Sequence, residues 1–336
     1  MKQMKKDHEI NRKPLKVGSF FAGLGGICIA FKNAGYELLW SNEFDKAACK
    51  TYRKNFDHPI IEEDLCGLKP NDKRLGKVDI ITGGFPCQAF SVAGHRKGFD
   101  DERGTLFFKM LPFIDAYKPK ALFFENVRYL KTHNGGKTYA AIKEALEERG
   151  YIIKDRILNT CEYSKIPQWR ERVYMVCFKN KKHAEEFERR GWPEKIDPKE
   201  RIPFDKIIDK TADEIHYFKN YPWYYKDAIK TVDDDKAFYQ WRRVYCRKNK
   251  AGVCPTLTAN MGGGGHNVPL VMDKKDLRRL TPQECLRLQG IDDKNFFFPD
   301  DISTGAKYKQ VGNAVSVPVV QTIAENIRKI LNGEGE

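Results

Sequence analysis

The chain has 336 residues, a length that suggests one large domain with a substantial core and a second, smaller domain. Lys and Arg number 60 against 46 Asp and Glu, and the net charge of +14 favours a polyanionic partner, nucleic acid before an anionic membrane surface, over a merely soluble basic protein. No run of about 18 apolar residues occurs, which excludes a membrane-spanning helix.

In the first half of the chain, predicted strands and helices alternate as they do in an α/β fold. Residues 1–14 are charged, without the apolar core of a signal peptide, and we interpret them as a disordered basic arm. Short apolar strands then alternate with amphipathic helices, which favours a doubly wound, mostly parallel sheet. The predicted strands are Lys16–Phe21, Glu37–Asn42, His58–Ile61, Val78–Thr82, Ala121–Glu125, Ile152–Leu158 and Arg172–Phe178, and the predicted helices are Gly26–Ala34, Asp45–Asn55, Thr105–Tyr117 and Lys137–Arg149.

The glycine-rich turn Phe20–Gly26 joins the first predicted strand to the first helix, where backbone can approach a ligand closely. A dinucleotide fingerprint requires a third glycine at Cys28, so a nicotinamide cofactor is disfavoured. Glu43, at the end of the second strand, can accept from ribose hydroxyls, although an ordinary surface Glu is equally consistent. Asp64, after the third strand, can accept from an adenine amino group. Together they favour a nucleoside cofactor without pyrophosphate, and S-adenosylmethionine fits best.

The segment Gly83–Ser91 (Gly-Gly-Phe-Pro-Cys-Gln-Ala-Phe-Ser) follows the strand Val78–Thr82. It delivers Cys87 at the carboxyl end of a strand, where open α/β sheets place their chemistry. Pro86 restricts the backbone and holds the neighbouring thiol in place. For an isolated Pro-Cys pair, a small buried cysteine beside a turn is the simpler interpretation.

The cysteines point to a reducing environment. None of the nine forms a C-x-x-C pair or has a histidine at zinc-ligand spacing, so no metal site is predicted. Their odd number, and the position of several inside apolar strands, favour free thiols in the cytoplasm over disulfides.

The composition and the pattern of predicted elements change near residue 179. Residues 179–278 are rich in charge and aromatics, lack the strand–helix rhythm and contain the run Gly262–Gly265, so we interpret them as the smaller domain. Thr281–Gln289 opens with Thr-Pro and a Glu at the capping-box position, which predicts a helix start. A last helix is expected near Val317–Leu331.

Seven short motifs occur in a specific order along the chain. They are Phe21–Gly26, Gly84–Gln88, Gly104–Phe108, Glu125–Val127, Gln168–Arg172, Arg279–Glu284 and Gln310–Val315. In that order they resemble the DNA (cytosine-5) methyltransferases, especially the compact bacterial enzymes of restriction–modification systems. Ser19 replaces an Asp that is frequent in the family, and Ile291 replaces a frequent Phe.

The resemblance implies the domain layout. Residues 15–178 and 279–336 are expected to form a Rossmann-like catalytic domain of the class I S-adenosylmethionine-dependent methyltransferases, with the last helix completing the cofactor pocket. Residues 179–278 are expected to form an irregular target recognition domain. The expected cofactor-binding residues are Phe21, Gly23, Leu24, Gly25, Gly26, Glu43, Phe44, Asp64, Leu65, Pro86, Leu106, Asn313 and Val315.

The resemblance also assigns catalytic roles. Carbon-5 of cytosine becomes nucleophilic only after a thiolate adds at carbon-6, and Cys87 matches that nucleophile. Glu125 matches the residue that hydrogen-bonds or protonates N3, and burial beside phenylalanines is expected to raise its pKa. Arg172 is expected to contact the cytosine O2 and to orient Glu125 and Cys87, and Arg170 to act as a support or a phosphate contact.

The expected partner is double-stranded DNA, bound by a monomer. The target base has to leave the helix, and residues 88–104 resemble the family's mobile loop that closes over it. Sequence reading is expected from side chains of the smaller domain in the major groove. The expected DNA-binding residues are Gln88, Ser91, Arg242, Arg243, Arg247 and Thr256.

Three alternatives differ in class. A tRNA cytosine-5 methyltransferase has the same fold and mechanism, but the run Gln88–Ser91 favours DNA. A catalytically inactive DNA-binding protein is disfavoured by the intact Cys87, Glu125 and Arg172. A nicotinamide oxidoreductase is disfavoured by Cys28 and by the absence of an acid suited to hydride transfer.

Overall fold

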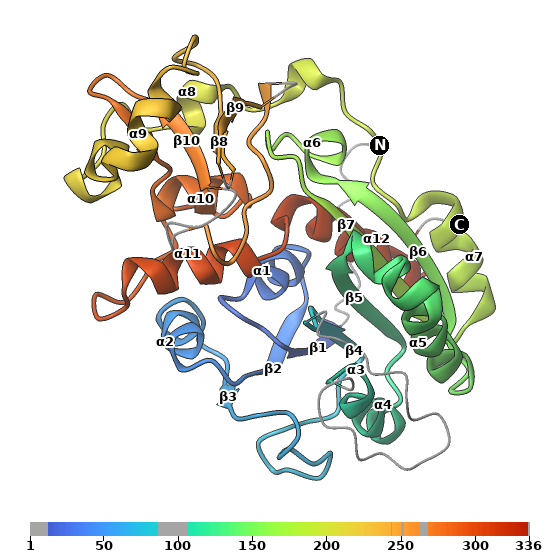
Figure 1. The fold of residues 1–336 in the computed structure, drawn as a ribbon. Coiled ribbons are helices and arrows are strands. Elements are labelled where there is room, and N and C mark those ends of the chain that lie inside the picture. Colours follow the sequence, from blue (N-terminus) through green and yellow to red (C-terminus); the bar gives the residue numbers. More distant parts are fainter. Residues whose placement is uncertain (1–12, 87–105, 243, 250–251, 262–267, 335–336) are drawn as a thin grey trace, which may run out of the picture.

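A computed structural model of the chain describes residues 13–86, 106–242, 244–249, 252–261 and 268–334 (Figure 1). The large domain contains a seven-stranded sheet in the order β3-β2-β1-β4-β5-β7-β6. Neighbouring strands are parallel except for β7, which runs antiparallel to both β5 and β6. The strands are β1 Lys16–Phe20, β2 Glu37–Glu43, β3 Ile60–Glu62, β4 Ile80–Gly83, β5 Ala121–Val127, β6 Ile152–Asn159 and β7 Glu171–Phe178. The α/β fold with a doubly wound, mostly parallel sheet is therefore confirmed.

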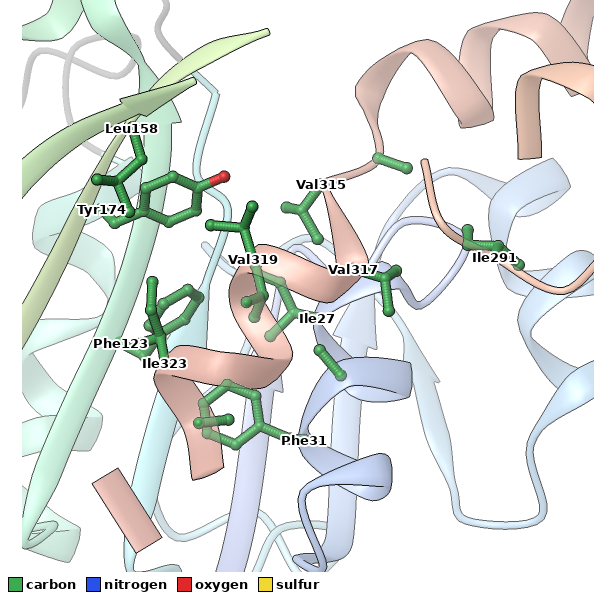
Figure 2. Close-up of a cluster of buried hydrophobic side chains, with 14 of the residues drawn as sticks. Ile27, Phe31, Phe123, Leu158, Tyr174, Ile291, Val315, Val317, Val319 and Ile323 are labelled. Carbon is green, nitrogen blue, oxygen red and sulfur yellow. The ribbon is translucent and has the colours of Figure 1, made fainter. Parts of the chain in front are cut away.

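Helices cover both faces of this sheet. Because successive strand residues point to opposite faces, Phe123 belongs to one buried cluster and Phe124 to the other. The cluster that contains Phe123 packs α1 Gly26–Asn33, α7 Lys181–Arg190 and α12 Val317–Leu331 against the sheet, and Figure 2 shows its centre. The cluster that contains Phe124 packs α4 Leu111–Tyr117 and α5 Lys137–Glu147 against the other face.

The single helix expected over Thr105–Tyr117 is two helices in the structure, α3 Leu106–Lys109 and α4 Leu111–Tyr117. Pro112 lies in the first turn of α4, where its missing N–H costs nothing. A continuous helix would place the proline ring against the carbonyl of residue 108, so the chain breaks at Met110 and starts again.

The other helices of the large domain are short or lie near its edges. They are α2 Lys46–Asn55, α6 Thr160–Tyr163, α10 Pro282–Leu288 and α11 Thr304–Asn313, with 3-10 turns at Arg128–Lys131 and His133–Gly136. The capping box predicted for Thr281 and Glu284 is present at the start of α10. Among the residues described, no helix combines the length and the apolar character needed to cross a membrane.

A second, smaller sheet has four antiparallel strands in the order β11-β10-β8-β9. It lies in a separate lobe beside α10 and α11 (Figure 1) and has its own apolar cluster around Tyr239 and Leu270. The sequence analysis named none of these strands, because three to five residues are too few to show a pattern. The elements between α7 and α10 are α8 Phe204–Ile207, α9 Pro222–Ile229, β8 Tyr239–Trp241, β9 Cys246–Lys248, β10 Val268–Met272 and β11 Leu277–Arg279, with 3-10 turns at Pro198–Glu200, Glu214–His216 and Phe218–Asn220.

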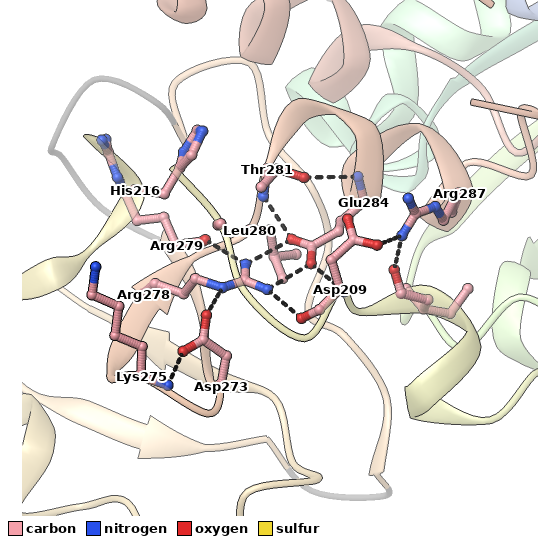
Figure 3. A network of polar contacts seen from close by, with 12 residues as sticks. Asp209, His216, Asp273, Lys275, Arg278, Arg279, Leu280, Thr281, Glu284 and Arg287 are labelled. Atoms are coloured by element: carbon pink, nitrogen blue, oxygen red, sulfur yellow. Dashed lines mark hydrogen bonds and ion pairs between the residues drawn. The ribbon is translucent and has the colours of Figure 1, made fainter. Parts of the chain in front are cut away.

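A buried polar network joins the small sheet to α10 (Figure 3). Arg278 on β11 has no exposed side-chain surface and donates to Asp273 at 2.6 Å and to both oxygens of Glu284 at 2.7 and 2.8 Å. It also donates to the carbonyl of Asp209 at 3.0 Å. Removal of Arg278 would therefore leave the carboxylates of Asp273 and Glu284 buried without their ion-pair partner, and removal of Glu284 would also remove part of the cap of α10.

Candidate active site

The candidate cofactor residues meet at one edge of the large sheet, the carboxyl edge of its parallel strands. Phe21 follows β1, Phe44 follows β2, and Asp64 and Leu65 follow β3. Pro86 follows β4 and is the last residue described before the gap at 87–105. Four turns that are distant in the sequence therefore lie side by side, as ligand sites of doubly wound sheets do.

Glu43 connects the turn after β1 to the turn after β2 through hydrogen bonds. Its Oε2 accepts from the backbone N–H of Gly23 at 2.9 Å, and its Oε1 accepts from those of Phe44 and Asp45, both at 2.9 Å. The side chain is 9% exposed, so its carboxylate is shielded but reachable. Oε1 already accepts two hydrogen bonds, whereas Oε2 accepts one and keeps a lone pair that can accept from a ribose hydroxyl.

The turn after β1 has a backbone suited to a ligand. Phe21 has φ +54°, which is unusual for a bulky residue and is enforced by its surroundings. Gly23 has φ +57°, and a side chain there would meet no atom within 4 Å, so its backbone borders open space. Helix α1 begins at Gly26 without a side-chain cap, which leaves backbone N–H groups for an anionic group.

The remaining cofactor candidates differ in exposure. Phe44 is 65% exposed, a large apolar surface that a planar ring can cover. Leu24 and Leu65 are buried, whereas Asp64 is exposed and its Oδ1 accepts from the Cys66 N–H at 2.8 Å. Leu106 is half-buried at the start of α3.

The carboxyl-terminal segment returns to the same turn. Val315 is buried, and its side chain lies so close that a Cβ added at Gly26 would be 3.2 Å from it. Figure 2 shows Val315 and Val319 facing Ile27 of α1. Asn313, at the end of α11, is exposed. Residues nearly 300 positions apart therefore share one site.

Four predicted residues, Cys87, Gln88, Ser91 and Arg243, lie outside the described residues. In the sequence, the first three come shortly after β4. Asn126 fixes the segment between β4 and Cys87, because its Nδ2 donates to the carbonyl of Phe85 at 2.8 Å. Sequence reasoning assigned Asn126 no role of its own, and the only signal was a polar residue next to the expected acid in a buried strand.

Glu125 and Arg172 form a buried pair on the neighbouring strands β5 and β7. Arg172 Nε lies 3.0 Å from Glu125 Oε1, and the two side chains are 12% and 9% exposed. Burial raises the pKa of Glu125, and the charges of Arg172 and Arg170 only partly oppose it. The expected direction of this pKa shift is therefore confirmed.

The backbone that leads to Cys87 passes directly beside this pair. A Cβ added at Gly84 would lie 3.9 Å from Glu125 Oε2 and 3.7 Å from the side chain of Ile27. The tertiary structure thus brings β5, β7 and the segment before Pro86 to one point. A shielded carboxyl group with a raised pKa, next to a guanidinium, can donate or share a proton with a polar ring placed there.

Arg170 is not at the surface. It is 1% exposed and donates to the carbonyls of Leu257 at 2.8 Å, Gly312 at 3.1 Å and Ala314 at 2.6 Å. Burial, reinforced by Arg172, lowers its pKa to about 9. A buried guanidinium cannot reach a DNA phosphate, so the support role is the one that stays a prediction.

The DNA-binding candidates that the structure describes lie in or near the small lobe. Arg242 is half-buried and Arg247 is exposed, and both donate to Oε1 of Gln240, at 3.4 and 2.9 Å. Thr256 is half-buried, and its hydroxyl donates to the carbonyl of Trp169 just before β7. No group of three or more His, Cys, Asp or Glu within the described ranges is arranged to hold a metal ion.

The fold is that of known methyltransferases. The solved structure of S. pombe Dnmt2 methyltransferase has a TM-score of 0.73 with this chain at 18% identity, covering 95% of this chain and 99% of the other. Spodoptera frugiperda DNMT2 gives 0.72 at 19% identity, with 94% and 99% covered. At these identities the likeness shows that the chain shares their fold.

The family follows from the sequence comparisons. The model of the C-5 cytosine-specific DNA methylases matches residues 15–329, and the chain belongs to this family. It is 46% identical to the type II methyltransferase M.Bsp6I of Bacillus sp. (strain RFL6), over 94% of this chain and 99% of the relative. It is 36% identical to the type II methyltransferase M.HhaI of Haemophilus parahaemolyticus, over 95% of each.

Proposed function

We propose that the chain transfers a methyl group from S-adenosylmethionine to carbon-5 of a cytosine in double-stranded DNA, through a covalent bond between Cys87 and carbon-6. The observation that carries this proposal is the buried Glu125–Arg172 pair beside the backbone of Gly84. It places the proton-sharing carboxyl group of Glu125 beside Gly84, which stands three residues before the expected nucleophile Cys87. The chain belongs to the C-5 cytosine-specific DNA methylases.

The proposed chemistry begins at Cys87. Its thiolate adds to carbon-6, a bond forms between Sγ and that carbon, and electron density moves onto N3. Glu125 shares its proton with N3, which its raised pKa favours near neutral pH. The bound cofactor supplies an electrophilic methyl group on a sulfonium sulfur. When carbon-5 bonds to that methyl group, the methyl–sulfur bond breaks and its electron pair stays on the sulfur. A base then removes the carbon-5 proton, the bond between carbon-6 and Sγ breaks, and Cys87 is released as a thiolate.

Arg172 orients the acid in this proposal. Its Nε holds Glu125 from the side of β7, which fixes the carboxyl group at the carboxyl end of β5. The guanidinium also provides donors for the cytosine O2, an acceptor that a flipped base presents on its pairing edge. Gln88 and Ser91 are proposed to contact DNA from the segment after the nucleophile.

The cofactor proposal rests on the residues gathered at the carboxyl edge. Glu43 would take the ribose hydroxyls, the exposed ring of Phe44 would cover the adenine, and Asp64 would accept from its amino group. Pro86, Leu106 and the glycine turn would enclose the remainder, with Asn313 and Val315 closing the pocket from the carboxyl-terminal side. The shielded but unsaturated carboxylate of Glu43 fits a nucleoside.

We assign reading of the target sequence to residues 179–278, with residues 15–178 and 279–336 as the catalytic domain. The separate four-stranded sheet and its own apolar cluster support this division. Helix α7 at its start packs against β6, β7 and α12 and belongs physically to the large sheet. Arg242, Arg243 and Arg247 are proposed to meet the DNA, and Thr256 a phosphate near the flipped base.

Replacement of Arg242 or Arg247 with Ala should alter DNA recognition without changing cofactor affinity. A guanidinium that reads a guanine edge is worth about 1–3 kcal/mol of discrimination, whereas one that contacts a phosphate changes the salt dependence instead. Binding of cognate and altered duplexes at several salt concentrations distinguishes the two. Arg189→Ala on the exposed face of α7 is the matched control. Unchanged DNA binding in both variants would move the recognition surface elsewhere.

The proposed function is tested with a duplex that carries 5-fluorocytosine at the target position. In this base a fluorine replaces the hydrogen on carbon-5, so no proton can be removed there and the enzyme cannot be released. The covalent adduct of DNA and protein should therefore persist in a denaturing gel. It should form only when S-adenosylmethionine is present. The recognition sequence for this duplex is obtained beforehand, by methylation sequencing of the DNA of a host that expresses the chain. Absence of the adduct on a cognate duplex would rule out addition at carbon-6, and an adduct with tRNA alone would favour the tRNA alternative.

The cellular role is proposed from the relatives. Both relatives named above are type II methyltransferases, which supports a role in restriction–modification. A reducing cytoplasm suits the cysteines described, eight of which form no disulfide. We propose that the chain acts there as a monomer.

A further inference from the structure

Three buried polar side chains form a junction at the centre of the molecule. They are Gln168 and Arg170, which precede β7, and Gln289, which follows α10, and they are 0%, 1% and 0% exposed. Buried polar groups of this size are costly unless every partner is in place. We call these three side chains the junction, and together they bond to two segments that the proposed function assigns to different ligands.

On one side the junction holds the segment that is assigned to DNA. Gln168 accepts from the backbone N–H of Leu257 at 3.2 Å, and Arg170 donates to the carbonyl of the same residue at 2.8 Å. Leu257 is thus held at both of its backbone polar groups. The preceding residue, Thr256, is the proposed phosphate contact, so the position of this contact depends on the junction.

On the other side the junction holds the segment that is assigned to the cofactor. Arg170 donates to the carbonyls of Gly312 and Ala314 at 3.1 and 2.6 Å, and Gln289 donates to Ala314 at 3.3 Å. These carbonyls flank Asn313, a proposed cofactor residue. The Arg170 fork therefore bonds to both segments at once.

The two segments also touch directly. A Cβ added at Gly312 would lie 2.3 Å from the carbonyl carbon and oxygen of Thr258, a separation that no side chain tolerates. The junction is closed by a bond from Gln168 to Gln289 at 3.3 Å. With backbone against backbone and each side tied to the same guanidinium, neither segment can shift without moving the other.

We propose that the junction couples DNA binding to cofactor binding, with Gln168, Arg170 and Gln289 as positioning residues. When one ligand orders its segment, the junction orders the other segment as well. The second ligand then binds with a smaller loss of conformational entropy. The coupling must be reciprocal, because it is a difference of binding free energies. This inference rests on the proposed function, which supplies the ligands of the two segments.

The test measures DNA affinity with and without S-adenosylhomocysteine, a product that cannot react. Fluorescence anisotropy of a labelled cognate duplex gives the dissociation constant in each case. We expect the product to tighten DNA binding by about tenfold in the wild-type chain, within the usual range of coupling. In Gln168→Met, which keeps the length and removes the hydrogen bonds, the effect should fall to about threefold or less.

Arg170→Lys is the second variant, because an ammonium keeps the charge and cannot bridge both segments as the guanidinium fork does. Gln321→Met is the matched control, since this glutamine on α12 bonds only to Asn33 and Glu325 among the contacts described. It should retain the full coupling. Thermal melts identify variants that do not fold, and Arg170→Lys decides the result if Gln168→Met is one of them.

Folded variants that keep the wild-type coupling would overturn the inference, even if each ligand binds more weakly. A wild-type chain that binds both ligands without mutual effect would overturn it as well, and would leave the proposed function intact. A wild-type chain that binds no S-adenosylhomocysteine would contradict the proposed function itself, and the inference with it.

Discussion

Methyl transfer should fall below about one percent of the wild-type rate when Cys87 is replaced with Ser, while DNA binding persists. A serine hydroxyl stays protonated near neutral pH, and its oxygen adds to carbon-6 far less readily than a thiolate. The assay follows transfer of a labelled methyl group to duplex DNA, with the dissociation constant measured separately. The loss should lie in kcat, because the nucleophile contributes to the chemical step.

Cys66→Ser is the matched control for this experiment. Cys66 is exposed in the turn after β3 and carries no proposed role, so the variant should keep full activity. A Cys87→Ser variant that retains more than about a percent of the activity would refute the assignment of the nucleophile, because a general acid alone does not supply the missing bond. Loss of DNA binding together with activity would indicate damage to the fold instead.

Glu125→Gln should reduce kcat by about 10²–10⁴-fold, the usual contribution of a positioned acid. The amide keeps a donor for N3 but has no proton to give, and it loses the charge that pairs with Arg172. Burial has the largest effect on the pKa of Glu125 and raises it, so the protonated form extends to higher pH than in an exposed Glu.

The pH dependence of kcat/KM follows from that direction. Activity that needs protonated Glu125 is present below its pKa and is lost as pH rises through it. We expect this alkaline limb above the ordinary range of glutamate titration, and we expect it to disappear in Glu125→Gln. Glu62→Gln, an exposed glutamate paired with Arg53, should keep the wild-type profile. An unchanged limb in Glu125→Gln would assign the titration to another group.

Much of the large domain was predictable because its signals are local. All seven strands of the large sheet were placed within two residues at each end, since apolar runs between turns and helices are typical of buried strands. The start of α10 followed from Thr281 and Glu284, whose capping box needs only four neighbouring residues. The expected nucleophile and acid were found in the same way, from short motifs at the ends of predicted strands.

Other features could not be predicted because their causes lie far away in the sequence. Helix α11 shows no clear apolar period, and it buries Gln310 and Gly312 beside segments that only folding brings near. The strands of the small sheet are too short to show alternation, and they are stabilised by pairing with each other. The sequence around Asn126 does not indicate its role, because its amide donates to the carbonyl of Phe85, 41 residues away in the chain.

By itself, then, the sequence determined the succession of strands in the large sheet, the family and the residues expected to react, because each depends on residues that are neighbours along the chain. The tertiary structure alone decided that Arg170 is a buried link rather than a surface cation, and that Glu125 is desolvated beside Arg172. Burial and long-range hydrogen bonds depend on which segments pack together, and a linear pattern does not contain that information.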